Sequence, residues 1–422
     1  MNLLLRLMIP VLLLAAGWRV FHRLEAEESS RPEEGLQGLE RAIRWDPTAP
    51  RHHFLMGISL RDLPQFHDPA RAREHLERAA GLNPYSWRYR LELARLYELT
   101  GRVEEAAGAL EKAVELNPRS GPYRWRLANV YLRNDSLTRA LPELGAAIEA
   151  DRSLFQPALD LLLKAGGSFE QAGAIWPADR DARLQLLRLA CAKGDPAQGG
   201  APLAFLREQW RRLEEAPEPP TVQEGAFYLE HLLRRKAFAQ ARQRWIELAR
   251  RNGIEDPSFR AGRNLVWNGD FERPLTQGPL DWRLASSTAY SIELAEGEGF
   301  QGSTALRIDF KGLENLNFSG VGQQVVVEPG LEYELGFRLR SEDLTSEQGI
   351  YLEVVEAGGS RRLLETEPVL GTTSWTAYGG KLYLSEGSTV WIRLRRKPSQ
   401  RIDNLLRGRL WLDDVRLVAC TP

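Results

Sequence analysis

Apolar residues change their spacing once along the chain, shortly after Asn252. Before this point they recur at i, i+3 and i+4, for example in the stretches 182–195 and 203–215, and this spacing predicts amphipathic helices. After it the spacing becomes two: in Leu331–Arg340 ("LEYELGFRLR") each apolar residue alternates with a charged residue or glycine. Such alternation is typical of a half-buried antiparallel strand. The pattern predicts an all-α region followed by an all-β region.

Four similar segments repeat within the helical region. They begin at Leu39, Leu76, Leu110 and Leu144, so successive copies lie 37, 34 and 34 residues apart. Small residues at fixed places let two antiparallel helices approach closely, and one helical hairpin cannot bury its apolar face alone. We therefore predict stacked hairpins over residues 25–258, with degenerate copies beyond residue 154. The small residues are Gly57, Ala72 and Ala79, then Ala94, Ala106 and Ala113, then Ala128, Ala140 and Ala147.

This period, the small residues and a proline that closes three of the four copies resemble the tetratricopeptide repeat, a helix–turn–helix unit. In the fourth copy Arg152 replaces the proline. The resemblance implies a peptide-binding or assembly surface, in which the first helix of each repeat lines a groove. Arginine forks and an amide suit an acidic or C-terminal peptide, although the same arginines are also compatible with an ordinary solvated face. The implied groove residues are Arg88, Leu91, Arg95, Trp125, Asn129 and Arg133.

The β region is predicted to begin at Leu265, in "LVWNGDFERP", which we interpret as its first strand. Short alternating segments follow, separated by turn residues, and together they predict an all-β sandwich over residues 262–420. A connector containing glycine, proline and arginine precedes it, and we expect few contacts to cross this connector. The predicted strands lie within 304–310, 322–327, 331–340, 349–356, 377–385, 389–396 and 408–418.

Five motifs of the β region, in this order, resemble the carbohydrate-binding modules of families 4, 9 and 22, which are jelly rolls of the galactose-binding-like type. They are "NGDFE", Trp282, "STALRIDF", "VGQQVVVEPGLEYELGFRLRS" and "LWLDDVRL". The resemblance implies a structural calcium ion held between the first and last strands by Asp270, Glu272 and Asp413 or Asp414. Calcium takes six to eight oxygen ligands. The alternative is that Asp270 caps a turn and Asp414 faces solvent.

The same resemblance implies that sugar rings stack on exposed aromatic residues. The candidates are Trp282, Phe318, Tyr351, Tyr383 and Trp391. Most of them are expected to be core residues, and Trp391 in particular lies inside an apolar strand. Alternation also predicts two outward-facing arginine pairs on one sheet face, Arg338 with Arg340 and Arg393 with Arg395. Such pairs, joined by Tyr351, suit an acidic glycan or the carboxylates of a partner. An ordinary solvated face is the alternative.

Residues 1–24 form a separate segment. The stretch Leu7–Gly17 carries no charge, and it extends to Leu3–Trp18 if Arg6 snorkels, which approaches the shortest membrane-spanning helix. A cleaved secretory signal fits as well, because Ala15 and Ala16 are small residues suited to cleavage. Both interpretations place the remaining chain outside the cytoplasm, in a bacterial-type cell envelope. A buried core helix is the third alternative for this segment.

Composition narrows the function classes. The formal net charge is −1, and neither region carries a large excess of one sign, so nucleic-acid binding is not expected. The two cysteines, Cys191 and Cys420, exclude a disulfide framework. All six histidines precede the sandwich and no phosphate-binding or nucleophile motif is found, so no enzyme is expected.

The sequence therefore predicts a membrane-tethered scaffold for surface polysaccharide export or assembly, with a protein partner on the repeats and a glycan on the sandwich. This prediction is based on the combination of the two domains. The alternative is an adaptor between proteins whose sandwich does not bind sugar.

Overall fold

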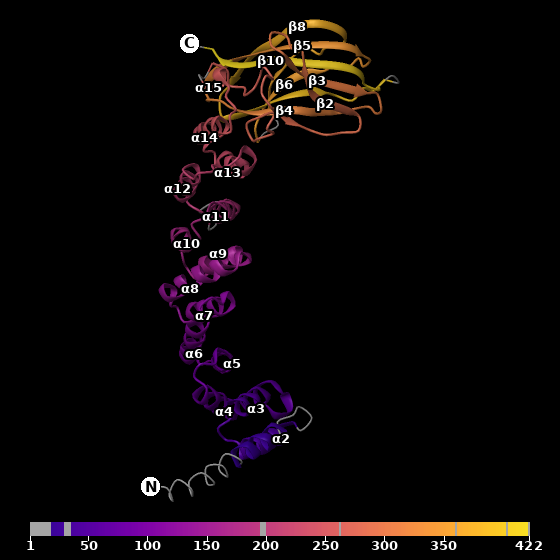
Figure 1. Ribbon diagram of the computed structural model, residues 1–422. Coiled ribbons are helices and arrows are strands. Elements are labelled where there is room, and N and C mark those ends of the chain that lie inside the picture. The colour runs from indigo at the N-terminus through magenta and orange to yellow at the C-terminus, as the bar shows by residue number, and fades with distance from the viewer. Residues whose placement is uncertain are drawn as a thin grey trace, which may run out of the picture. The chain divides into compact units, whose positions relative to one another are not determined.

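The structure is a computed structural model that describes residues 18–28, 35–194, 200–260, 263–358, 361–401 and 404–420. By its internal contacts the chain divides into two units, residues 1–189 and 190–422. The first unit is helical, and the second contains the last helices and a sandwich of two sheets (Figure 1). The predicted fold class, a helical solenoid followed by an all-β sandwich, is confirmed.

The predicted anchor or signal, Leu3–Trp18, lies almost entirely outside the described residues. Within the described part of the chain, no helix has both the length and the apolar character needed to cross a membrane.

The first unit is built from consecutive helices. Its helices are 18–28, α2 (Gly35–Trp45), α3 (Pro50–Asp62), α4 (Pro69–Leu82), α5 (Trp87–Leu99), α6 (Val103–Leu116), α7 (Gly121–Arg133), α8 (Leu137–Ala150), α9 (Phe155–Lys164), α10 (Phe169–Ile175) and most of α11 (Arg180–Ala192).

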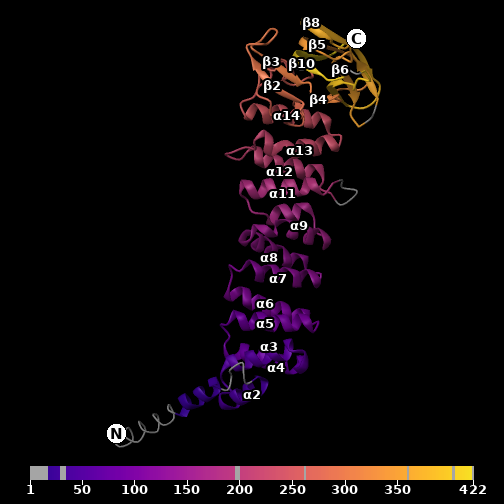
Figure 2. The same cartoon turned by 90° about the vertical axis from the view of Figure 1, so that its right-hand side faces the viewer.

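The repeats predicted from the sequence form the hairpins α3–α4, α5–α6 and α7–α8, which follow one another in Figure 2. Their predicted small residues are at the helix contacts: Ala94, Ala106 and Ala113 are fully buried, and so are their equivalents in the neighbouring repeats. At Gly57 a Cβ atom would lie 2.6 Å from Cγ of Leu76. Any larger side chain at these positions would separate the two helices.

A tyrosine–glutamate hydrogen bond connects each repeat to the preceding one. The hydroxyl of Tyr97 donates to Glu77 at 2.8 Å, and the hydroxyl of Tyr131 donates to Glu111 at 2.7 Å. Both residues of the second pair lie 34 positions after those of the first, so this contact has the period of the repeat. Burial, together with the Glu77 carboxylate, raises the pKa of Tyr97 to about 12.

The second unit begins with the end of α11 and contains α12 (Leu203–Glu214), α13 (Val222–Arg234), α14 (Phe238–Arg251) and α15 (Pro257–Arg260). Within the proline-rich stretch 213–224, residues 215–221 form a loop. It ends in a capping box, in which Thr221 and Glu224 each accept the backbone N–H of the other. This arrangement satisfies two N–H groups at the start of α13.

The sandwich consists of two five-stranded antiparallel sheets, each named here by its central strand. The β9 sheet has the order β1-β4-β9-β6-β7, and the β10 sheet has the order β2-β3-β10-β5-β8. The strands are β1 (Arg283–Leu284), β2 (Tyr290–Glu296), β3 (Thr304–Lys311), β4 (Phe318–Val326), β5 (Leu331–Leu344), β6 (Tyr351–Glu356), β7 (Arg362–Glu365), β8 (Gly371–Leu384), β9 (Thr389–Arg396) and β10 (Arg407–Ala419).

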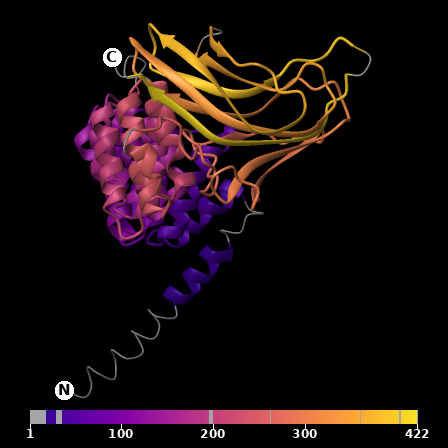
Figure 3. The same cartoon turned by 90° about the horizontal axis from the view of Figure 1, so that it is seen from above.

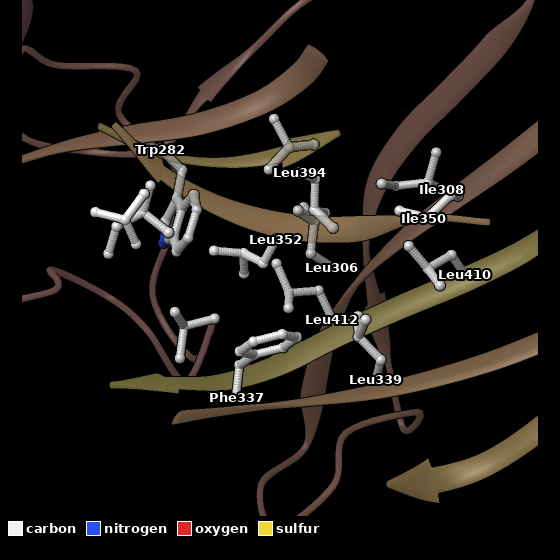
Figure 4. Close-up of a cluster of buried hydrophobic side chains, with 14 of the residues drawn as sticks. Trp282, Leu306, Ile308, Phe337, Leu339, Ile350, Leu352, Leu394, Leu410 and Leu412 are labelled. Atoms are coloured by element: carbon white, nitrogen blue, oxygen red, sulfur yellow. The ribbon is translucent and has the colours of Figure 1, made fainter. Parts of the chain in front are cut away.

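Side chains from both sheets form one core. Figure 4 shows Leu352 and Leu394 of the β9 sheet facing Leu306, Phe337 and Leu412 of the β10 sheet. The alternation predicted for 331–340 places its apolar residues in this core. The strands bend as they cross the sandwich (Figure 3).

The stretch "LVWNGDFERP" is not a strand, contrary to the sequence prediction. Residues 265–274 form turns, with positive φ at Asn268 and Phe271. This segment hydrogen-bonds to the second half of β10: the N–H of Leu265 donates to Leu417, and the N–H of Val415 donates to Gly269. The segment therefore continues the pairing of β10 beyond Leu412, where pairing with β3 ends.

Several contacts cross the connector between α14 and the sandwich, where few were expected. Trp267 packs edge-to-face against Trp245 of α14 and Phe259 of α15, with ring centroids 5.2 Å apart in both pairs. The buried carboxylate of Asp256 accepts the N–H of Asn268 at 2.8 Å. These contacts join the last helices to the sandwich within the second unit, so the predicted limits at 258 and 262 fall inside it.

We predict that Ala106→Leu lowers the stability of the repeats. The side chain of Ala106 is fully buried between helices, and overpacking of such a contact costs about 1–3 kcal/mol. Thermal unfolding followed by circular dichroism measures the effect. Ala70→Leu, at an exposed position near the start of α4, is the control, and equal melting temperatures for the two variants would contradict the prediction.

We also predict that Gly269→Ala destabilises the sandwich. A Cβ atom at this position would overlap the carbonyl oxygen of Val415, so the hydrogen bond between the turn and β10 has to break, at an expected cost of roughly 1–3 kcal/mol. Gly336→Ala in β5 is the matched control, because its Cβ would meet no atom within 4 Å. Urea unfolding should separate the two variants, and a Gly269→Ala protein as stable as the control would refute this role of the turn.

Candidate functional site

The predicted groove residues of the repeats lie on α5 and α7, and several of them already have partners. The Arg133 guanidinium pairs with Glu98 at 2.8 Å, and Arg126 pairs with the same carboxylate at 2.7 Å. The Asn129 amide donates to the carbonyl of Trp125 in its own helix. Glu98 therefore neutralises Arg133, a cation that was assigned to a ligand.

The neighbouring repeats show a second such pairing. The side chain of Arg61, which is almost fully buried, lies 2.7 Å from Glu92 of α5, and Arg95 approaches the same carboxylate at 4.0 Å. Within the described residues Arg88 has no carboxylate in ion-pair range, and its guanidinium lies over the ring of Trp87. Leu91 is half-buried. The groove thus carries alternating charges rather than a row of unpaired cations, and Arg61, Glu92 and Glu98 were not recognised from the sequence.

The two arginine pairs predicted to share one sheet face lie on different sheets. Arg338 and Arg340 belong to β5 of the β10 sheet, where their guanidinium groups lie over the rings of Phe300 and Trp411. Arg393 and Arg395 belong to β9. Alternation predicts on which side of a strand a residue lies, but it does not predict the sheet to which the strand belongs. Because β5 and β9 are in different sheets, the two arginine pairs do not form a joint site.

Trp282 is a core residue and not a sugar platform. Its side chain is 1% exposed and packs against Phe271 inside the sandwich. Its indole N–H donates to the carbonyl of Asn268.

The outward face of the β9 sheet, called the β9 face below, gathers polar and aromatic side chains from four strands. Val390, Ile392 and Leu394 point into the core, so the residues between them face outward. Strand pairing places Arg393 beside Gly322 on one side and Glu353 on the other, and places Arg395 beside Tyr351. The face comprises Arg283, Gly322, Gln324, Tyr351, Glu353, Val355, Trp391, Arg393 and Arg395.

Two neighbouring depressions lie on the β9 face. The first has a volume of about 380 Å³ and is lined by Tyr351, Glu353, Val355, Arg362, Arg393, Arg395 and Lys397. The second has a volume of about 400 Å³, and its lining includes Gln324 and Trp391 of the sheet, Arg283 of β1, and Glu230, Arg234 and Lys236 from α13 and the turn that follows it. Val355 and Trp391 are paired across β6 and β9, so the two depressions adjoin.

Glu353 is the carboxylate at the centre of the first depression. Its Oε1 lies 2.8 Å from Nη2 of Arg393 and 3.4 Å from Nε of Arg395. The Arg395 guanidinium also donates to the carbonyl of Phe318. These bonds hold both guanidinium groups against the sheet.

Two polar atoms at this depression have no hydrogen-bond partner among the described residues. They are the hydroxyl of Tyr351, whose side chain is 4% exposed, and Nε of Arg393. A buried polar group without a partner destabilises a protein by about 1–3 kcal/mol. Tyr351 was assigned to a glycan site from the sequence, whereas Trp391 was expected to be packed inside its strand. It is half-buried, with Arg283 over its ring.

The four carboxylates predicted to hold calcium separate into two groups. Asp270 pairs with Arg273 at 2.5 Å and Asp414 pairs with Arg416 at 2.6 Å. Glu272 and Asp413 instead approach one loop: Glu272 accepts the N–H of Thr304 at 2.9 Å, and Asp413 accepts the N–H of Phe300 at 2.7 Å.

Asp413 is the most perturbed of these carboxylates. Burial, and to a lesser degree the charges of Asp414 and Glu272, raises its pKa to about 6. No group of three or more histidine, cysteine, aspartate or glutamate side chains suited to a metal ion is present in the described ranges. Glu272 and Asp413 thus bind the same loop, whereas Asp270 and Asp414 are each paired with an arginine instead.

Two sequence models described as tetratricopeptide repeat match the chain, over residues 65–123 and 105–154. The chain therefore contains tetratricopeptide repeats, as its sequence predicts. A comparison with curated protein sequences gives no match.

Among solved structures, the chain is similar to MamA (AMB-1), with 25% identity over 28% of this chain and 64% of that chain, and a TM-score of 0.26. Less than two thirds of that protein is therefore covered. YrrB, described as "a TPR protein with an unusual peptide-binding site", is 16% identical over 48% of this chain and 86% of that chain, with a TM-score of 0.26. A CBM4 structure is 13% identical over 37% of this chain and 99% of that chain, with a TM-score of 0.28. At these TM-scores the likenesses assign no function to this chain.

Proposed function

We propose that this protein is a non-enzymatic scaffold of the cell envelope that binds a protein partner through its tetratricopeptide repeats and a glycan through the β9 face. In this proposal residues 1–24 tether the chain to the membrane or direct its export, and the protein serves the export or assembly of a surface polysaccharide.

The observation that carries the glycan part is the β9 face itself. It combines a half-buried indole, Trp391, with amide, hydroxyl and guanidinium groups around two adjoining depressions. Sugar rings bind to aromatic faces through their apolar C–H groups, and the polar groups around a concave site fix orientation by hydrogen bonds.

The protein-binding part rests on the repeats at residues 65–154. Stacked helical repeats form extended concave surfaces that suit a partner chain. The opposite charges of Glu92, Glu98 and Arg133 favour a partner segment that carries both signs over a purely acidic one. The alternative function is an adaptor between proteins whose sandwich binds no sugar.

A glycan screen of the full-length protein separates these functions. We expect binding to at least one polysaccharide, and we expect Trp391→Ala to lower the affinity roughly 5- to 30-fold, because one stacked aromatic ring contributes on the order of 1–2 kcal/mol. Tyr383→Ala is the control, since Tyr383 is exposed on β8 of the other sheet. Absence of binding to every glycan, with retained capture of a protein partner, would favour the adaptor.

We further propose that Glu272 and Asp413 hold a structural calcium ion with backbone carbonyl oxygens of the loop 299–304. The two carboxylates approach the same loop, and the raised pKa of Asp413 follows from its burial near a second negative charge. A bound cation would compensate both charges, and calcium prefers such oxygen ligands.

Calcium should then raise the melting temperature of the protein, and a chelator should lower it. At a hundredfold excess over the dissociation constant, the ion adds about 2.7 kcal/mol to the free energy of unfolding. Asp413→Asn should abolish this shift, whereas Asp414→Asn should retain it because Asp414 pairs with Arg416. A melting temperature indifferent to calcium and chelator would show that these carboxylates only accept hydrogen bonds from the loop.

A further inference from the structure

We propose that the glycan bound by the β9 face is anionic, with carboxylate groups of the uronic-acid type. This inference rests on the proposed function, because it names the class of ligand for the same face.

The charges around the two depressions are strongly unequal. Arg362, Arg393, Arg395 and Lys397 line the first depression with one carboxylate, Glu353. Three more basic residues line the second with one carboxylate, Glu230. The protein as a whole is nearly neutral, with a net charge of −1, so this excess is local. Concentrated positive charge around a concave surface attracts an anion and raises its local concentration.

Outside the linings, Glu365 of β7 pairs with Arg362 and lies 3.4 Å from Lys397. Glu365 and Glu353 together still leave the first depression with more cations than carboxylates. Glu353 also shows that Arg393 and Arg395 can share one carboxylate. Guanidinium groups suit carboxylates in particular, because their planar N–H forks match the two carboxylate oxygens.

The unpartnered atoms lie in the same place as the excess charge. The buried hydroxyl of Tyr351 and Nε of Arg393 belong to side chains that line the first depression. Both can donate a hydrogen bond. A carboxylate or sugar oxygen that enters the depression deeply enough to reach these two atoms would give each of them a hydrogen-bond partner, which would stabilise the complex.

A glycan fits this face better than an acidic polypeptide does. Strand β9 pairs with β4 on one side and β6 on the other, so the backbone N–H and C=O groups of its paired residues are used within the sheet. An extended polypeptide would have to leave its own backbone groups without backbone partners, whereas extended peptide ligands of sheets generally pair with an exposed edge. A sugar needs only side-chain donors and an aromatic ring, and the β9 face offers both.

The face is also long enough for more than one sugar ring. Alternate residues of a strand advance by about 6.6 Å, so the outward positions of β9 from Trp391 to Arg395 span about 13 Å. Trp391 is at one end of this row of outward residues, and Arg393 and Arg395 follow it toward the other end. The ligand we infer is therefore a chain in which a ring stacks on Trp391 and carboxylates follow.

Calorimetric titration of the full-length protein in neutral detergent tests the charge of the ligand. The probes are oligogalacturonide, alginate oligosaccharide and hyaluronan oligosaccharide, each paired with the same oligosaccharide after reduction of its carboxyl groups to alcohols. We expect at least one charged probe to bind about 10-fold or more tightly than its reduced form at low salt. This difference should shrink as the salt concentration rises.

Two variants link the binding to the β9 face. Arg393→Gln should lower the affinity for the charged probe roughly 10-fold or more. Arg409→Gln should leave it unchanged, because Arg409 is a similarly exposed, ion-paired arginine on the β10 sheet. Circular dichroism verifies that both variants are folded.

Tyr351→Phe separates ligand binding from a structural role. Because the hydroxyl has no partner within the described protein, its removal should leave the melting temperature unchanged or raise it. The affinity for the charged probe should nevertheless fall several-fold. A lower melting temperature with unchanged affinity would show that the hydroxyl serves the fold, and would contradict our assignment of Tyr351.

The remaining outcomes distinguish this inference from the function on which it rests. Equal or tighter binding of the reduced probes would refute an anionic ligand and leave glycan binding in place. Binding of polyaspartate as tight as that of the best charged probe would refute the glycan and indicate an acidic polypeptide. If no charged or reduced probe binds, and the broader glycan screen is also negative, both proposals fail.

Discussion

Strand β9 is hydrogen-bonded on both sides, and what the sandwich can offer a ligand depends on this constraint. The backbone of the paired residues is committed to β4 and β6, so chemistry at the centre of this sheet is left to side chains. Successive side chains of β9 point to opposite sides of the sheet. Ile392 and Leu394 therefore lie in the core, while Arg393 and Arg395 face outward. A one-residue slip in register would exchange the two sets, so the energy of the core also fixes the composition of the face.

The parts of the fold that require a regular repeat of residue types were predictable from the sequence. Alanines at Ala94 and Ala106 recur 34 residues later at Ala128 and Ala140, and all four are fully buried. Alternation likewise identified the inward residues of β5 and β9. Close approach of the helices requires a small residue at the same place in every repeat. A half-buried sheet requires an apolar residue at every second position of a strand. The Tyr97–Glu77 bond obeys the same period but was not recognised, since a tyrosine and a glutamate on separate helices mark no contact by themselves.

The errors concern information that periodicity does not contain. Strand order decides whether two outward arginine pairs meet, and it is set by long-range pairing, so Arg338 and Arg393 were wrongly placed on one face. The segment 265–274 contains apolar residues typical of a strand, yet Asn268 and Phe271 adopt positive φ because the chain turns to pair with the end of β10. Trp282 was read as a sugar platform, although a large aromatic residue with a bonded indole N–H is well suited to a core. Of the four carboxylates predicted to bind calcium, Glu272 and Asp413 both accept hydrogen bonds from the loop 299–304. Asp270 and Asp414 instead form ion pairs with arginines.

The contacts at Trp267 change how the β9 face should be understood. Trp267 lies between Trp245 of α14 and Phe259 of α15, and it also donates its backbone N–H to Gln323 of β4, which returns a hydrogen bond to the Trp267 carbonyl. One residue thus connects the last helices to a strand of the β9 sheet. This connection explains how Arg234 and Lys236, which belong to the helical sequence, come to line a depression with Trp391. The change in periodicity after Asn252 marks a change of secondary structure, but the second depression on the β9 face is lined by residues from both sides of it.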